Sequence, residues 1–156
     1  MADAAADKAE DGAEDKAEDG ALDDAVMARG RRILAAQPFS AAMGAELVDF
    51  TPGKVVIRLP MRADLKQHMG FAHGGAIAYM ADCALTFAGG SVLGDCLTAE
   101  FKINFMRPGQ GVALVAEGAV LSAGKASAIT RCEIWDEAED GTRKLCAAAQ
   151  GTIRKV

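Results

Sequence analysis

The stretch His68–Gly90, HMGFAHGGAIAYMADCALTFAGG, is almost entirely apolar, and its pattern predicts the helix that decides the fold. Apolar residues recur at the spacing i, i+3, i+4, i+7 and i+8, which is typical of a helix facing a core. A single carboxylate, Asp82, falls on a different stripe of the helix, together with Tyr79 and Thr86. We therefore expect an enclosed helix that directs one acid toward a second surface. The core-facing stripe comprises Ile77, Met80, Ala81, Ala84 and Leu85.

Two glycines, Gly74 and Gly75, stand where this helix is expected to begin. The first N–H groups of a helix have no partner inside it, and the helix dipole favours negative charge there. Without a Cβ, glycine lets a ligand approach those N–H groups closely. An ester or thioester carbonyl gains negative charge as it is attacked, so this helix start suits an oxyanion. The spacing leaves open a purely structural alternative, in which the glycines permit close packing and Asp82 is a hydrogen-bonded buried acid.

Gly74 and Asp82 of one chain cannot act on the same carbonyl. Eight helical residues rise about 12 Å, whereas both groups must lie within about 3 Å of the reacting atoms. Two antiparallel copies of the helix, related by a two-fold axis, would bring each acid near the other copy's glycine. This predicts an obligate homodimer with two shared sites.

Period-two alternation predicts strands on both sides of the helix. AELVDF (45–50) and GKVVIRLP (53–60) flank a Pro-Gly turn and are typical of a hairpin. Four further strands follow the helix, and their short turns predict antiparallel neighbours. A curved antiparallel sheet wrapped around one apolar helix satisfies both patterns, which gives the α+β class. These four strands are LTAEFKINFMRP (97–108), GVALVAEGAVLSAG (111–124), ASAITRCEIWDE (126–137) and RKLCAAAQGTIRKV (143–156).

Residues 1–24 form an acidic tail with an eight-residue repeat and almost no apolar residues to bury. We expect this tail to be disordered and residues 25–156 to form one domain, opening with a short helix that stops before Pro38. The tail holds ten acids and two lysines, whereas the rest holds 15 bases and 12 acids. This mildly basic domain suits an anionic ligand and is too weakly charged to indicate nucleic acid.

Neither the cysteines nor the histidines have metal-site spacing. The four cysteines contain no C-x-x-C pair, and His68 and His73 have no nearby cysteine, so we expect no metal and no cofactor. No secretory signal is recognisable, and the long apolar stretch contains Asp82 and many small residues. We therefore expect no membrane segment and a cytoplasmic protein with reduced thiols.

Two segments of the sequence resemble a known family. QHMGFAHGGAIAYMADCALTFAGG (67–90) and LTAEFKINFMRPGQG (97–111) are similar to hotdog-fold acyl-CoA thioesterases. Within the 4-hydroxybenzoyl-CoA thioesterase superfamily, the sequence resembles the PaaI-type (phenylacetate-degradation) group. The shared pattern is G-x-x-H-G-G, an Asp nine residues after the His, and an alternating strand ending in Pro. The similarity covers roughly residues 25–156 and implies the hotdog fold.

The resemblance implies a role for five residues. Asp82 matches the catalytic acid, which attacks the thioester or activates water, and Gly74 matches the residue whose N–H polarises the thioester carbonyl. His73 matches the motif histidine that orients the loop or the thioester. Gln67 takes the place of a common Asn near the attacking water, with a side chain one methylene longer. Thr98 aligns with a hydroxyl residue that helps to hold that water.

Coenzyme A contacts are implied as well. Gly75 lies beside the oxyanion position, and the turn near Arg107 and the loop around Gly124 and Lys125 match regions that touch the coenzyme A phosphates. The implied activity is hydrolysis of an acyl-CoA or aryl-CoA thioester without a cofactor, in a dimer that pairs into a tetramer in this family.

Two alternatives remain open at this point. A hotdog protein can bind acyl-CoA without turnover, because one fold hosts unrelated functions. A hotdog enoyl-CoA hydratase or dehydratase is the other alternative, although its proline-rich loop signature is missing. The acyl group itself is undetermined. Small residues along the helix leave room for either an aromatic or an aliphatic group, and these are Ala76, Ala78, Ala84 and Ala88.

Overall fold

A computed structural model describes residues 24–156 of the chain. The predicted disordered tail lies almost wholly outside the described residues. Residues 24–35 are helical, as predicted for the segment before Pro38. The elements that follow are α2 (Pro38–Met43), β1 (Glu46–Thr51), β2 (Lys54–Pro60), the 3-10 helix η1 (Ala63–Leu65), α3 (Gly74–Leu93), β3 (Cys96–Phe105), β4 (Ala113–Ala123), β5 (Ser127–Glu137) and β6 (Arg143–Lys155).

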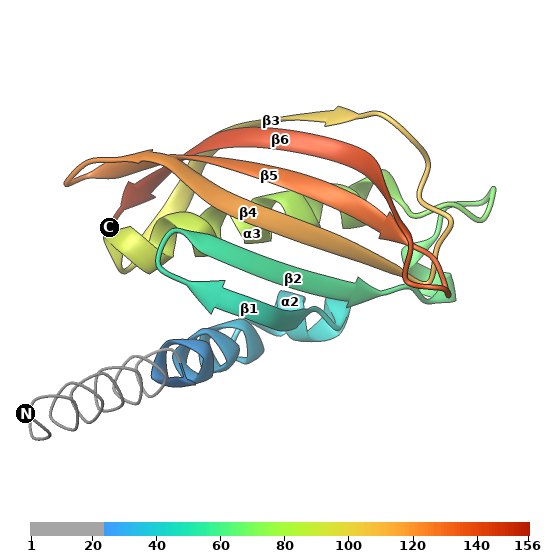
Figure 1. Cartoon of the computed structure of the whole chain (residues 1–156), viewed down its shortest axis with the longest axis horizontal. Helices are drawn as coiled ribbons and strands as arrows, with labels where there is room; N and C mark the ends of the chain where they lie inside the picture. Colours follow the sequence, from blue (N-terminus) through green and yellow to red (C-terminus); the bar gives the residue numbers. More distant parts are fainter. Residues whose placement is uncertain (1–23) are drawn as a thin grey trace, which may run out of the picture.

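The six strands form one antiparallel sheet in the order β1-β2-β4-β5-β6-β3. The sheet curves over α3, which lies against its concave face (Figure 1). This arrangement confirms the predicted α+β hotdog fold. The β1–β2 hairpin is also confirmed, with Thr51 paired to Lys54 around the Pro-Gly turn.

The prediction that the last four strands are sequential neighbours is wrong for β3. This strand pairs with β6, from Cys96 opposite Lys155 to Phe105 opposite Ala147. The segment 106–112 is too long for a tight hairpin, and its backbone bonds to other strands. The N–H groups of Met106 and Arg107 donate to Cys146 O, and Val112 N–H donates to Glu137 O. The chain therefore crosses the end of the sheet, and β3 becomes an edge strand.

Two short elements were not predicted. Helix α2 begins with Pro38 and ends at Gly44, whose φ of 78° terminates the helix in a conformation that glycine adopts freely. The 3-10 helix η1 lies between β2 and α3. Both are shorter than two helical turns, which leaves too few residues for a recognisable hydrophobic period.

The predicted core stripe of α3 is confirmed, because all five of its residues are at most 3 % exposed. Helix and sheet approach closely at Gly118 of β4, where a Cβ would lie 2.5 Å from Ala84 O. By length and composition α3 could cross a membrane, but 61 % of its most apolar window is buried inside the fold. The helix therefore serves as the core of the domain.

Candidate active site

Asp82 lies in the middle of α3, on the face that the sequence predicts. Together with Tyr79 and Thr86 it lines an open cavity of about 760 Å³. The opposite wall of this cavity is the beginning of β3, including Leu97, Thr98 and Phe101. The acid therefore faces a surface between the central helix and the edge strand, whereas the core stripe faces the sheet.

A pair of hydroxyl groups fixes the Asp82 carboxylate. Thr98 Oγ1 donates to Asp82 Oδ1 over 2.7 Å, and Thr86 Oγ1 lies 2.6 Å from Thr98 Oγ1. Thr86 Oγ1 is also 2.8 Å from Asp82 O. Each hydroxyl has one hydrogen, so Thr98 donates to the carboxylate, whereas Thr86 donates either to Asp82 O or to Thr98 Oγ1. Within residues 24–156 Oδ2 has no hydrogen-bond partner, which leaves this oxygen available to a water or a thioester.

The nearby thiol and phenol are not nucleophiles. Burial raises the pKa of the Cys83 thiol to about 12, so the sulfur keeps its proton near neutral pH. Burial likewise raises the pKa of Tyr79, whose hydroxyl has no hydrogen-bond partner within the described residues. Its ring packs edge-on against Phe39, with centroids 5.4 Å apart. Compared with this thiol and this phenol, the Asp82 carboxylate is therefore the better candidate for a base or nucleophile in the cavity.

His73 caps the start of α3 with its side chain. Its Nδ1 accepts from Gly75 N–H over 2.9 Å, so the neutral imidazole carries its proton on Nε2. A Cβ at Gly75 would lie 3.0 Å from this nitrogen, so a side chain here would crowd the capping histidine. The N–H of Gly74 has no hydrogen-bond partner among residues 24–156. Of the two glycines, Gly74 is therefore the one whose N–H is free, as the predicted oxyanion role requires.

Gln67 lies in the turn that precedes α3. Its Oε1 accepts from Met69 N–H over 2.6 Å, and its carbonyl accepts from Gly70 N–H over 2.9 Å. These bonds position the side-chain amide. Gln67 and Gly74 line the same cavity of about 450 Å³. Phe105, the last residue of β3, and Arg107, just beyond it, also line this cavity.

The predicted catalytic residues thus form two separate groups within one chain. Asp82 and Thr98 lie in one cavity, and Gln67 and Gly74 lie in the other. Gly75 lines the Asp82 cavity, although its N–H is occupied by His73. The two cavities lie near opposite ends of β3.

The residues expected to touch coenzyme A are also separated. Arg107 precedes β4, whereas Gly124 and Lys125 follow it, and a strand of eleven residues spans about 33 Å. The segment beyond Arg107 is anchored by Asp136, whose carboxylate accepts from the N–H groups of Gln110 and Gly111. One chain therefore does not bring Arg107 and Lys125 to the same ligand.

Two polar residues around the site were not among the predicted site residues. Thr86 extends the hydrogen-bond chain to the acid, and its position four residues after Asp82 already places it on the same helical face. Asp136 anchors the segment beyond Arg107 from β5. No local pattern links Asp136 to that segment, because Asp136 and Gly111 are 25 positions apart.

Comparisons with known proteins agree with this fold. The profile of the thioesterase superfamily matches residues 69–142. A candidate esterase of Saccharolobus solfataricus is 30 % identical over 112 residues, which cover 70 % of this chain and 72 % of that protein. A thioesterase family protein from Silicibacter pomeroyi has a TM-score of 0.76 at 28 % identity, over 80 % of this chain and 93 % of that one. A mutant of the phenylacetic acid degradation protein PaaI from Thermus thermophilus has a TM-score of 0.67 at 27 % identity, over 77 % and 100 %.

Proposed function

This chain belongs to the thioesterase superfamily and is a thioester hydrolase, and we propose that it hydrolyses acyl-CoA or aryl-CoA thioesters. The observation that carries the proposal is the Asp82 carboxylate, held at one oxygen by Thr98 and free at the other in an open cavity. The kinship with a phenylacetic acid degradation protein supports a coenzyme A thioester as the substrate class.

Asp82 supplies the chemistry at the thioester carbonyl. Its free oxygen either attacks the carbonyl carbon or takes a proton from a water that attacks it. In both cases the carbonyl oxygen becomes negative before the carbon–sulfur bond breaks. If Asp82 attacks, the bond breaks to leave an acyl–Asp82 anhydride and the coenzyme A thiolate, and water then hydrolyses the anhydride. If Asp82 activates water, the proton taken from that water passes to the leaving thiolate. The products are the free acid and coenzyme A.

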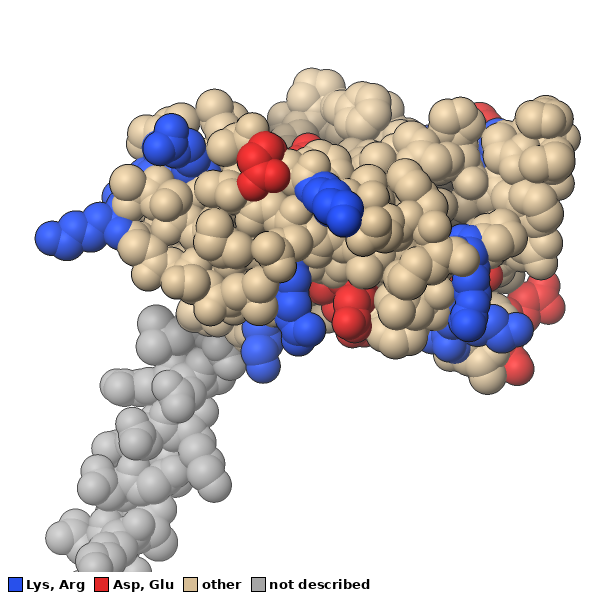
Figure 2. Space-filling model, turned by 90° about the horizontal axis from the view of Figure 1, so that it is seen from above, with Lys and Arg blue, Asp and Glu red and all other residues tan. Residues whose placement is uncertain are grey.

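A second copy of this chain completes the site. β3 is an edge strand of ten residues with one side unpaired in the sheet, and long edges of this kind readily pair with another chain. Leu97 and Phe105, near its two ends, are 64 % and 54 % exposed. Charged side chains are sparse on the side of the molecule that carries β3 and β6 (Figure 2). The two ends of β3 suit an apolar contact between two copies, and the exposed Glu100 and Lys102 lie between them.

Antiparallel pairing of β3 with its symmetry mate joins the two cavities. The beginning of β3 borders the Asp82 cavity, and its end borders the Gly74 cavity. A two-fold axis at the strand centre places the end of one strand beside the beginning of the other. Asp82 would then face the partner subunit's Gly74, and each dimer would hold two such sites. Pairing of dimers into a tetramer would bring further surfaces to the coenzyme A.

Release of free thiol from a panel of acyl-CoA and aryl-CoA thioesters tests the proposed activity. We expect turnover of several thioesters, measured by a thiol-reactive dye. Tight binding of the same thioesters without thiol release would instead make this a binding protein. Addition of water to an enoyl-CoA, measured as a loss of the enoyl absorbance, would instead indicate a hydratase.

Complementation between two inactive variants tests the shared site. We expect hybrid dimers of Asp82→Asn and Gly74→Pro to recover about half of the wild-type activity. In each hybrid, one site combines two intact residues and the other combines both substitutions. The two variants would be co-expressed with different tags, purified through both tags, and assayed for thiol release.

Hybrids of Asp82→Asn with Asp82→Ala are the matched control, because neither of their sites has the acid. These hybrids should remain inactive. If hybrids of Asp82→Asn with Gly74→Pro are equally inactive, the two residues act within one chain or not at all, and the shared site is wrong.

A further inference from the structure

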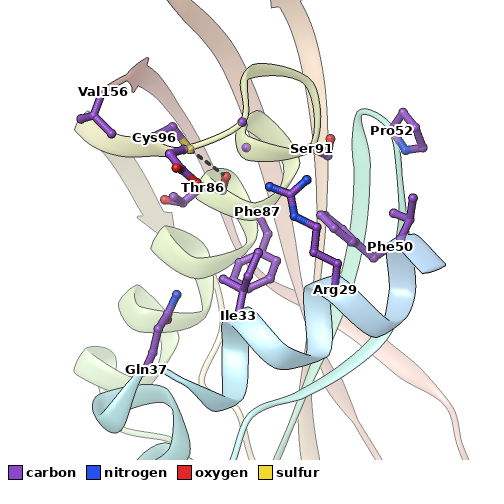
Figure 3. A pocket seen from close by; sticks show the side chains of 14 residues that line it. Arg29, Ile33, Gln37, Phe50, Pro52, Thr86, Phe87, Ser91, Cys96 and Val156 are labelled. Carbon is purple, nitrogen blue, oxygen red and sulfur yellow. Dashed lines mark hydrogen bonds between the residues drawn. The ribbon is translucent and has the colours of Figure 1, made fainter. Parts of the chain in front are cut away.

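A third cavity, of about 290 Å³, lies beneath the helical segment 24–35. Its walls are mainly apolar, with Ile33 of that segment facing Phe87 of α3 (Figure 3). Phe87 packs edge-on against Phe50 of β1, with ring centroids 5.7 Å apart. The space is therefore bounded by the N-terminal helical segment, the second half of α3 and the β1–β2 hairpin.

This cavity adjoins the one that holds Asp82. Four residues line both of them: Gln37, Thr86, Phe87 and Cys96. The wall along α3 extends from Asp82 to Gly90 and Ser91, and eight helical residues rise about 12 Å. Gly90 lies on this wall, where a Cβ would come within 3.1 Å of Cys96 Sγ, so Cys96 bounds the path beside the helix. A group attached at Asp82 could therefore run along the helix into the space beneath segment 24–35.

We propose that the acyl part of the substrate extends past Thr86 into this cavity, so that segment 24–35 sets the acyl length that the enzyme prefers. This inference rests on the proposed thioesterase function. The occupant it names is an uncharged medium-chain aliphatic or aryl-alkyl group. An apolar cavity of about 150 Å³ binds benzene, so the larger volume here accommodates a ring or several methylenes beyond the reacting carbon.

The charges around the cavity favour an uncharged occupant. Arg29 points into it in Figure 3, and Asp95 lines it as well. These two side chains have opposite charges, so neither an anionic nor a cationic acyl terminus gains a net attraction. Apolar area removed from water then dominates binding, and each buried methylene should raise kcat/KM about fourfold.

An acyl-length series in wild type and Ile33→Trp tests the inference. Ile33 is 41 % exposed, so the larger ring can enter the cavity without displacing a buried side chain. We expect wild-type kcat/KM to rise from C4-CoA to C8-CoA. The Trp variant should lose about tenfold or more on C8-CoA and stay within about twofold on C4-CoA. Arg32→Trp is the matched control, because Arg32 is on the same helix but does not line the cavity.

Each outcome decides the inference. If Ile33→Trp keeps the wild-type dependence on acyl length, the inference about the acyl cavity is wrong, while the proposed thioesterase function still stands. If wild type prefers ω-carboxyl chains over uncharged chains of equal length, the inference is wrong as well. If Ile33→Trp fails to fold, Val26→Trp on the same wall replaces it. If wild type hydrolyses no thioester, the proposed function fails separately, and calorimetric binding of the same series decides whether affinity depends on length and on Ile33.

Discussion

Replacing Asp82 by Asn is expected to lower kcat/KM for thioester hydrolysis by about 10² to 10⁴, which is the usual contribution of a positioned acid or base. The amide has nearly the same shape as the carboxylate and can still accept from Thr98 Oγ1. It cannot take a proton from water, and it is a poor nucleophile. The loss should therefore appear in kcat, with folding intact. Steady-state thiol release with wild type and variant side by side measures the effect.

Asp49→Asn provides the control for this substitution, because it removes a carboxylate from an exposed position on β1. Its activity should match that of wild type. If Asp82→Asn retains more than about a tenth of wild-type kcat/KM with an unchanged unfolding curve, Asp82 is not the catalytic group.

A single turnover in isotope-labelled water separates the two roles of Asp82. If the carboxylate attacks the thioester and water then hydrolyses the acyl-enzyme at the Asp82 carboxyl carbon, the label appears first in the enzyme. If Asp82 activates water, the label enters the released acid directly. Mass spectrometry of the peptide that contains Asp82 and of the product acid would distinguish these results.

Replacing Gly74 by Pro is expected to lower kcat by about 10² to 10³, the cost of removing one oxyanion donor. Gly74 is the first residue of α3, where proline is well tolerated and where its missing N–H breaks no helical bond. His73 has φ −66° and ψ 137°, which suits the residue before a proline. The substitution therefore removes the unpaired N–H with little strain on the helix. Thiol release and far-UV circular dichroism would measure activity and helix content together.

Gly74→Ala is the matched control, because it keeps the N–H and adds only a methyl group. The new Cβ would lie 3.9 Å from Phe105 Cε1, an ordinary contact. Activity of the alanine variant well above that of the proline variant would assign the effect to the N–H. Equal losses in both variants would instead indicate that substrate needs the space at this position, and the oxyanion role would be overturned.

The sequence determined the central helix, its buried stripe and the stripe that carries Asp82. These features depend on residues three and four apart, and helical geometry fixes where such residues lie. The capping of Gly75 by His73 and the β1–β2 hairpin are similarly local, because their partners lie within a few residues of one another. Because the helix is apolar almost all round, it had to be enclosed by the predicted strands, and the α+β class followed from this requirement.

Only the tertiary structure decided what β3 contacts. Its pairing with β6 joins residues about 50 positions apart, and the alternation within each strand fits more than one neighbour. That pairing makes β3 an edge, sets Thr98 beside Asp82, and keeps Gly74 in a separate cavity. The adjacency of the Asp82 cavity and the space beneath segment 24–35 likewise depends on side chains from distant elements. Such contacts follow from how a helix and strands pack together, and spacing along the chain does not specify them.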